Sequence, residues 1–214
     1  MIWMTDSDST GAHQRRQHWD NVYTSKAPNQ LSWYQPVPAT SLSLILAANL
    51  NPAAKIIDIG GGVSTLADNL LAQGYRSITV LDLASVALDQ SKQRLGPAAK
   101  QINWLVADIT TWQPHARYDL WHDRAVFHFL TDPGDRRAYF TALKNALQPG
   151  ATVILATFAL DGPERCSGLS VQRYSPETLA EELGSEFTLL ETAPEDHHTP
   201  SGTIQRFVYC RFTH

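Results

Sequence analysis

Short apolar runs alternate with segments of helical periodicity through most of the chain beyond residue 40. The apolar runs predict strands at 55–59, 77–83, 102–108, 117–123 and 151–158. The amphipathic segments predict helices at 40–50, 64–74, 85–96 and 136–150. Strands that alternate with helices favour parallel pairing, because each helix carries the chain back across the sheet. This part of the chain is expected to form three layers, with helices on both faces of a sheet.

The last forty residues depart from this alternation. A short helix is expected at 175–184, and two apolar runs at 187–193 and 203–212 follow it with no helix between them. Consecutive strands of this kind pair antiparallel, and the polar stretch 195–198 is expected to lie in the loop that joins them. The predicted fold is therefore α/β: a three-layer α/β/α sandwich with a Rossmann-like, mostly parallel seven-stranded sheet that ends in an antiparallel hairpin.

The chain before residue 41 has a different character. Residues 1–12 are rich in Ser, Thr and Asp without periodicity, which predicts a disordered N-terminus. Residues 13–40 combine a weak helical pattern with several prolines, and we expect them to form a cap over the binding site. Residues 41–214 then form the main domain.

Composition narrows the class of protein. With 43% hydrophobic and 18% charged residues, the 214-residue chain can bury a core, and its net charge of −4 gives no broad positive field for nucleic acid or an anionic membrane. Its apolar runs are shorter than the ~20 residues that a bilayer span needs. Two distant cysteines without a CxxC pair indicate neither a disulfide framework nor a thiolate zinc site. We expect a cytoplasmic protein with a small-molecule partner, monomeric or weakly dimeric.

A glycine cluster at 60–62 follows the first predicted strand, at the edge of the sheet where ligands of open parallel sheets bind. Asp82 ends the second strand, 20 residues after Gly62, where a carboxylate can accept hydrogen bonds from both ribose hydroxyls. The same carboxylate is also suited to cap the helix that starts near Ala84, and the two roles can coexist. The pattern predicts a nucleoside ligand.

The residues around the glycines limit which nucleoside fits. Thr65 stands where a dinucleotide fingerprint has its third glycine, and no Walker loop is present. Asp58 precedes the glycines, where its charge would repel a pyrophosphate but could hold an α-amino group. This combination favours a ligand that contains an amino-acid moiety.

Three motifs in this order are IIDIGGG (56–62), VLDL (80–83) and VAD (106–108) followed by Ile109. Together with the terminal hairpin they resemble the class I S-adenosylmethionine-dependent methyltransferases, over roughly residue 41 to the C-terminus. The segments HWDNVY and SWY, near 18–34, also resemble the N-terminal lids of small-molecule members. The resemblance implies S-adenosyl-L-methionine as cofactor and S-adenosyl-L-homocysteine as product. The resemblance also implies which residues bind each part of the cofactor. Asp58, Gly60 and Gly62 would bind the methionine part, and Asp82 would bind the ribose. Leu83, Asp108 and Ile109 would bind the adenine.

Aromatic residues of the expected cap form a second candidate group. The faces of Trp33 and Tyr34 could attract the sulfonium of the cofactor and exclude water, and Trp19 could contact the methyl acceptor. Packing of the cap onto the sheet would explain the same residues. Both interpretations stay open at this point.

The end of the fourth parallel strand carries polar residues that could face the reacting methyl group. Arg124 could anchor an anionic acceptor, and Asp123 or His128 could take a proton from it. Alternatively, Asp123 and Arg124 form a local ion pair and His128 lies between apolar neighbours. The segment 158–174 could form the acceptor pocket through Arg165, Cys166, Arg173 and Tyr174, or it could be a surface loop.

No metal site is expected. Asp196, His197 and His198 are adjacent on a predicted loop and lack the fixed spacing of ligands carried by a helix. The leading hypothesis is a methyltransferase that transfers the methyl group to a small-molecule thiol, amine or carboxylate by in-line displacement. The alternatives are a protein lysine methyltransferase, an NAD-dependent reductase and a non-catalytic nucleoside-binding module.

Overall fold

The computed structural model describes residues 6–214 of the chain. Its α-helices are α1 (Asp6–Ser25), α2 (Ala39–Ala47), α3 (Leu66–Ala72), α4 (Ser85–Leu95), α5 (Pro133–Ala146) and α6 (Pro176–Leu183). Its strands are β1 (Lys55–Ile59), β2 (Ser77–Asp82), β3 (Ile102–Val106), β4 (Tyr118–Arg124), β5 (Leu147–Phe158), β6 (Arg165–Cys166), β7 (Leu169–Ser170), β8 (Thr188–His198) and β9 (Ile204–Thr213). Short 3₁₀ turns occur at Pro28–Gln30, Gly96–Gln101 and Phe127–Phe129. None of the helices within residues 6–214 is both long and apolar enough to cross a membrane.

The main sheet has seven strands in the order β3-β2-β1-β4-β5-β9-β8. Strands β1 to β5 pair in parallel, whereas β9 pairs antiparallel with both β5 and β8. The two short strands β6 and β7 form a separate antiparallel hairpin. The predicted mostly parallel sheet with a terminal antiparallel hairpin is confirmed.

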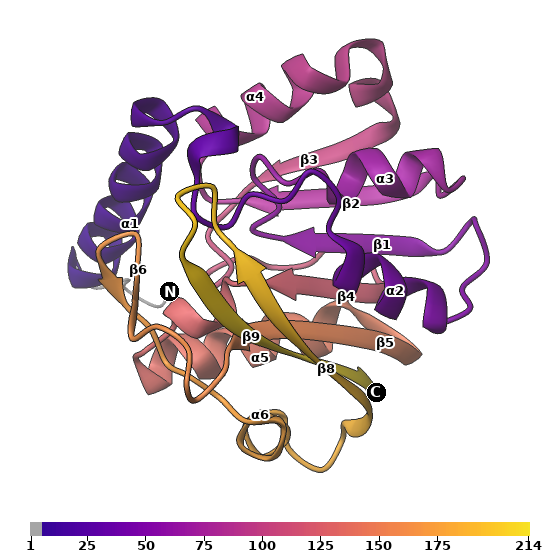
Figure 1. The fold of residues 1–214 in the computed structure, drawn as a ribbon. Coiled ribbons are helices and arrows are strands. Elements are labelled where there is room, and N and C mark those ends of the chain that lie inside the picture. Colours follow the sequence, from indigo (N-terminus) through magenta and orange to yellow (C-terminus); the bar gives the residue numbers. More distant parts are fainter. Residues whose placement is uncertain (1–5) are drawn as a thin grey trace.

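Helices cover both faces of this sheet (Figure 1). Neighbouring residues of a strand point to opposite faces, so Ile56 packs in one core with α2, α3 and α4, while Ile57 packs in the other with α5 and α6. Both isoleucines are fully buried. A sheet buried on both faces needs apolar residues at successive positions, which explains the continuous apolar runs of the central strands.

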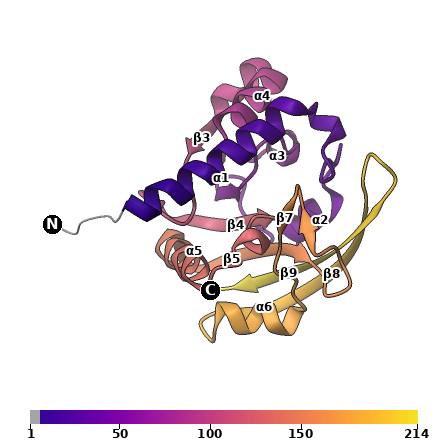
Figure 2. The same cartoon turned by 90° about the vertical axis from the view of Figure 1, so that its left-hand side faces the viewer.

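The strand order reverses between β1 and β4. The connections that follow these two strands leave in opposite directions, and in open parallel sheets ligands bind in the crevice at this point, at the carboxyl ends of the strands. Helix α1 runs across this edge of the sheet, with the β6–β7 hairpin beside it (Figure 2). Trp19 and Tyr23 attach α1 to Ala84 and Ala87 at the start of α4. The first helix therefore covers the place where a ligand of this fold binds.

Three boundaries differ from the sequence expectation. Residues 6–12 belong to α1, whereas a disordered segment was expected over 1–12; residues 1–5 lie outside the described residues. Helix α5 ends at Ala146 rather than near 150, because Pro149 disfavours helical backbone before it and Leu147 already pairs with Tyr118. Strand β8 continues through the polar stretch 195–198, because a strand with one exposed face keeps its alternation with polar residues.

Candidate active site

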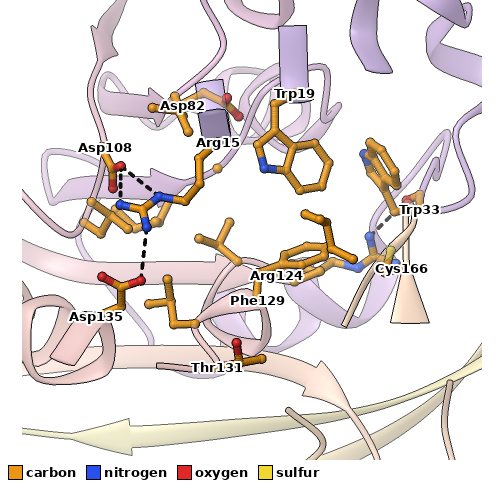
Figure 3. A pocket seen from close by; sticks show the side chains of 18 of the residues that line it. Arg15, Trp19, Trp33, Asp82, Asp108, Arg124, Phe129, Thr131, Asp135 and Cys166 are labelled. Atoms are coloured by element: carbon orange, nitrogen blue, oxygen red, sulfur yellow. Dashed lines mark hydrogen bonds and ion pairs between the residues drawn. The ribbon is translucent and has the colours of Figure 1, made fainter. Parts of the chain in front are cut away.

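A cavity of about 380 Å³ lies at the carboxyl edge of the sheet, under α1 (Figure 3). We call one end of it the acidic end, which contains Gly60, Asp82, Leu83, Asp108 and Ile109. The other end, here the aromatic end, contains Trp19, Trp33, Phe129, Phe158 and Phe207 together with Cys166, Leu169, Ser170 and Gln205. Segments from the start, middle and end of the chain thus meet around one space.

The glycine turn after β1 requires its glycines. Gly60 and Gly62 have φ angles of +63° and +36°, which side chains of L-residues rarely adopt. A Cβ on Gly60 would lie 2.0 Å from Cγ2 of Val126, and one on Gly62 would lie 2.8 Å from the hydroxyl of Tyr23. The turn therefore brings bare backbone to the acidic end of the cavity.

Asp82 is buried at the end of β2 and lines the cavity. Its Oδ1 accepts a hydrogen bond of 2.8 Å from the backbone N–H of Ala84, so the cap contact predicted from the sequence exists. Burial raises the pKa of Asp82 to about 7. A carboxylate that is expensive to keep charged in this position gains from any ligand that donates hydrogen bonds to it.

Asp108 is tied to α1 by a residue that the sequence analysis missed. Its Oδ2 accepts hydrogen bonds from Nε (3.2 Å) and Nη2 (3.0 Å) of Arg15, while its Oδ1 accepts from the backbone and hydroxyl of Thr110. Arg15 also donates to Asp135 on α5, at 3.1 Å. A sequence signal existed, because Arg15, Trp19 and Tyr23 are four residues apart on one helix face and all three line the cavity.

Replacement of Arg15 by alanine is expected to loosen the first half of α1. The guanidinium is about one-third exposed, so its paired contacts are expected to contribute on the order of 1 kcal/mol. Hydrogen exchange of the amides of residues 11–19 should become several-fold faster while exchange in β1 and β4 stays unchanged. Arg16→Ala, one position along the same helix, is the control, and equal effects of the two substitutions would contradict the role given to Arg15.

Asp58 lies beneath the glycine turn, beside a smaller cavity of about 40 Å³ that Tyr34 also lines. Its Oδ1 is 2.7 Å from Nδ1 of His122, and Nε2 of His122 is 2.9 Å from the hydroxyl of Ser41. All three polar side chains are buried. This small cavity shares Gly60, Trp33 and Arg124 with the large one, so Asp58 and Tyr34 border an extension of the same site.

The aromatic end is built by rings that pack against one another. The ring of Trp19 lies 5.0 Å from that of Phe129 and 5.9 Å from that of Trp33, both in edge-to-face geometry. Tyr23 contacts Trp33 in the same way, at 6.0 Å. Trp19 and Trp33 pack the N-terminal segment against the domain, as one interpretation expected, and they also line the cavity, where the other interpretation places them.

Of the three residues expected to carry catalysis, Arg124 lines the cavity, but its guanidinium is engaged. It donates to the hydroxyl of Tyr209 (2.8 Å) and the carbonyl of Trp33 (2.9 Å), and it lies 3.5 Å from Oε1 of Glu195. Its ion-pair partner is thus Glu195 and not Asp123, which corrects the alternative interpretation of the two as a local pair. These contacts make Arg124 a support for the loop that carries Trp33.

Asp123 and His128 do not line the cavity. Asp123 accepts hydrogen bonds from the hydroxyl of Tyr139 (2.7 Å) and from the backbone N–H groups that follow β4, and burial raises its pKa to about 6. Nδ1 of His128 accepts from the N–H of Phe158, and burial lowers the pKa of His128 to about 3, so the ring is neutral. The geometry places both residues in structural positions.

Among the four candidates of segment 158–174, Cys166 lines the cavity. Burial raises the pKa of its thiol. Arg165 contacts the carbonyl of Gly168, and Arg173 contacts the carbonyl of Gly162 and the carboxylate of Glu164, so both are used within the loop. Tyr174 packs on Phe127 in the core. The sequence analysis missed Gln205 and Phe207, which reach the cavity from β9.

Comparison with known proteins bears on this arrangement. Residues 56–150 match the family model of a methyltransferase domain. The solved structure of a 1,6-didemethyltoxoflavin-N1-methyltransferase from Burkholderia thailandensis, with S-adenosylhomocysteine bound, is similar over 100% of this chain and 92% of its own, with a TM-score of 0.69 and 18% identity. Residues 56–150 of this chain form a methyltransferase domain. The resemblance and the cofactor predicted from the sequence are confirmed.

Curated relatives of this methyltransferase domain differ in what their names say they modify. A malonyl-[acyl-carrier protein] O-methyltransferase of Ilyobacter polytropus is 28% identical over 50% of this chain and 40% of its own length. A probable thiol methyltransferase of Arabidopsis thaliana is 27% identical over 65% and 62%, and a mouse eEF1A lysine and N-terminal methyltransferase is 28% identical over 54% and 16%. The chain spans less than two thirds of each of these relatives.

Proposed function

We propose that this chain transfers the methyl group of S-adenosylmethionine to a small-molecule nucleophile, a thiol, amine or carboxylate, by in-line displacement. The observation that carries the proposal is the single cavity in which an acidic end at the strand reversal continues into an aromatic end under α1. The acidic end is suited to hold the nucleoside, and the aromatic end is suited to hold an acceptor next to it.

The residues of the acidic end fit the cofactor. Gly60 lines the cavity with bare backbone, in a turn where a Cβ on Gly60 or Gly62 would collide with Val126 or Tyr23. The buried carboxylate of Asp82 is placed to accept hydrogen bonds from the ribose hydroxyls. Leu83 and Ile109 line the same end as Asp108 and would enclose the adenine ring. Asp58, beneath the turn, is assigned to the amino group of the methionine part.

The bound cofactor supplies a methyl group on a positively charged sulfur, which is already a strong electrophile. The protein then contributes alignment and the exclusion of water. Trp19, Trp33 and Phe129 supply apolar walls beside the acidic end, and the faces of the two tryptophans can attract the sulfonium. Arg124 contributes by holding the Trp33 carbonyl, and so orients one of these walls.

A second candidate within the same chemistry is methylation of a protein lysine, which the eEF1A-directed relative supports. A small molecule is favoured because the cavity lies beneath α1 and the segment that carries Trp33. A reductase is disfavoured further by Thr65, whose hydroxyl donates to the carbonyl of Gln35 and so fills the place of a third glycine. We also propose a reducing, cytoplasmic setting, which suits two buried free cysteines, and a monomer or weak homodimer that binds no nucleic acid.

Thermal unfolding of the purified chain with S-adenosylmethionine, S-adenosylhomocysteine and NAD tests the proposal. Protection by the first two and not by NAD is expected, because a ligand that binds the native state at a hundred times its Kd adds about 2.7 kcal/mol to the free energy of unfolding. A screen of thiols and amines for S-adenosylhomocysteine formation follows. Protection by NAD alone would support the reductase, and binding without turnover of any acceptor would support the non-catalytic module.

A further inference from the structure

We propose that His122 is a positioning residue for the cofactor: held by Ser41, it fixes the carboxylate of Asp58 so that one oxygen faces the amino group of the methionine part. This inference rests on the proposed function, in which Asp58 binds that amino group, and it adds two residues to the site. It follows from the register of the sheet, the hydrogen bonds of the three side chains, and the small cavity beside them.

The sheet itself brings Asp58 and His122 together. The strand order reverses between β1 and β4, and Asp58 lies directly opposite His122 in their parallel register. Opposed residues of neighbouring strands point to the same face of a sheet. Two positions earlier, Ile56 and Leu120 are also opposed, and both pack in the core that contains α2. The polar pair therefore continues an apolar row to the edge of the sheet, where the glycine turn begins.

The hydrogen bonds of His122 fix the orientation of its ring. Its Nδ1 is 2.7 Å from Oδ1 of Asp58, and its Nε2 is 2.9 Å from the hydroxyl of Ser41 on α2. An ionised carboxylate only accepts hydrogen bonds, so Nδ1 carries a proton and donates it to Asp58. A hydroxyl can donate or accept, so Ser41 satisfies Nε2 whether or not that nitrogen is protonated. A histidine held at both nitrogens cannot turn away from the carboxylate.

The second oxygen of Asp58 remains available to a ligand. All three side chains are buried, and 5% of the side-chain surface of Asp58 stays accessible, beside the small cavity of about 40 Å³. Oδ2 lies under the turn, where a Cβ on Gly61 would collide with it. It makes no hydrogen bond within residues 6–214, and yet it is not sealed off from the cavity. An ammonium group that enters this cavity would therefore meet a fixed acceptor with a free lone pair.

The value of this arrangement lies in binding more than in stability. Buried charged groups commonly stabilise a fold no better than apolar side chains of similar volume, because their desolvation is costly. A preorganised acceptor, by contrast, does not have to be ordered when the ligand arrives. Without the Nδ1–H of His122, Asp58 would lose a charge-assisted hydrogen bond and its carboxylate could rotate. The amino group of the ligand would then meet a weaker, poorly directed partner.

The test compares the calorimetric affinities of two ligands: S-adenosylhomocysteine and its desamino analogue, in which 4-mercaptobutyrate replaces homocysteine and only the amino group is missing. We expect the full chain to bind S-adenosylhomocysteine at least tenfold more tightly than the analogue. In His122→Leu this preference should fall below about threefold, through weaker binding of S-adenosylhomocysteine. His122→Asn, whose amide can donate from near the position of Nδ1, should keep most of the preference. In Asp58→Ala the preference should be absent, so that adding His122→Leu changes it no further.

Matched controls distinguish positioning from a general loosening of the fold. His128→Leu makes the same change at another buried histidine, one that lines neither cavity, and should keep the preference. Ser41→Ala should lower the preference about threefold, whereas Ser43→Ala, at an exposed position of the same helix, should leave it unchanged. If His122→Leu does not fold, His122→Gln replaces it, because its longer amide can reach Ser41 but has no donor at the place of Nδ1.

The inference is overturned if the preference survives without the Nδ1 donor, if the affinities for both ligands fall equally, or if His128→Leu lowers the preference as much. It is also overturned if His122→Asn retains no more of the preference than His122→Leu, or if the wild-type chain binds both ligands equally well. Failure of S-adenosylhomocysteine to protect the wild-type chain from unfolding would instead overturn the proposed function itself.

Discussion

Replacing Asp82 with alanine is expected to weaken binding of S-adenosylhomocysteine by about 5- to 150-fold, or about 1–3 kcal/mol. The carboxylate is buried, faces the cavity and is assigned to both ribose hydroxyls, so its loss removes two charge-assisted hydrogen bonds at once. Calorimetric titration measures the effect directly. Asp89→Ala, an exposed carboxylate on α4 paired with Lys92, is the control and should leave the affinity unchanged. Equal affinities of Asp82→Ala and the wild type would remove Asp82 from the binding site.

The raised pKa of Asp82 gives the same prediction a pH dependence. Its pKa of about 7 in the fold means that protonation below neutrality removes acceptor capacity, so affinity should rise between pH 6 and 8, and Asp82→Asn should lose that part of the rise. Stability should change in the opposite direction. Because the folded pKa lies above the unfolded value of 3.8, this group stabilises the fold below pH 4, and that contribution is lost as the pH rises through 7. Denaturant titrations of the wild type and Asp82→Asn across this range measure it.

The second large effect is expected for Gly60→Ala. The substitution forces a residue with a side chain into a φ of +63°, which costs about 1–2 kcal/mol, and places its Cβ 2.0 Å from Cγ2 of Val126. Since Val126 itself lines the cavity, relief of this contact moves either the turn or the valine into the space of the ligand. We expect at least a tenfold loss of S-adenosylhomocysteine affinity together with a lower free energy of unfolding.

Gly74→Ala separates the two effects. Gly74 has a φ of +96° after α3, and no atom lies within 4 Å of the Cβ that alanine would add. This variant should therefore lose stability through backbone strain and bind the ligand normally. Unfolding by denaturant and calorimetric binding of both variants decide the matter. Normal binding by Gly60→Ala would show that the turn does not approach the cofactor.

The parts of the site that follow from local sequence were predictable. Gly60, Gly62 and Asp82 stand at the ends of strands whose apolar runs are unmistakable, and parallel strands bring those ends together. The orientation of Asp123 also follows from the strand pattern, although we expected this residue to face the reacting methyl group. Successive strand residues face opposite ways, so Asp123 shares a face with the buried Trp121 and turns to Tyr139, whereas His122 turns to Ser41.

The remainder depended on contacts between distant parts of the chain. From its neighbours in sequence, Arg124 was expected to bind an anion. In the fold its guanidinium instead contacts Tyr209 of β9 and Glu195 of β8, which lie 85 and 71 residues away along the chain. Gln205 reaches the cavity because β9 pairs antiparallel with β5, a register that apolar patterning alone does not specify. Which polar group meets which is decided by this tertiary pairing and not by neighbours in sequence.

The cover of the cavity has one fixed side and one weakly held side. The segment before α2 is held at three points: Ser32 and Gln35 by His197 and Glu195 of the terminal hairpin, and Trp33 by Arg124 at the end of β4. The first half of α1 is held to the opposite rim by the half-buried contacts of Arg15 with Asp108 and Asp135. We therefore expect ligands to enter and leave the cavity on the side of Arg15, where fewer contacts hold the cover.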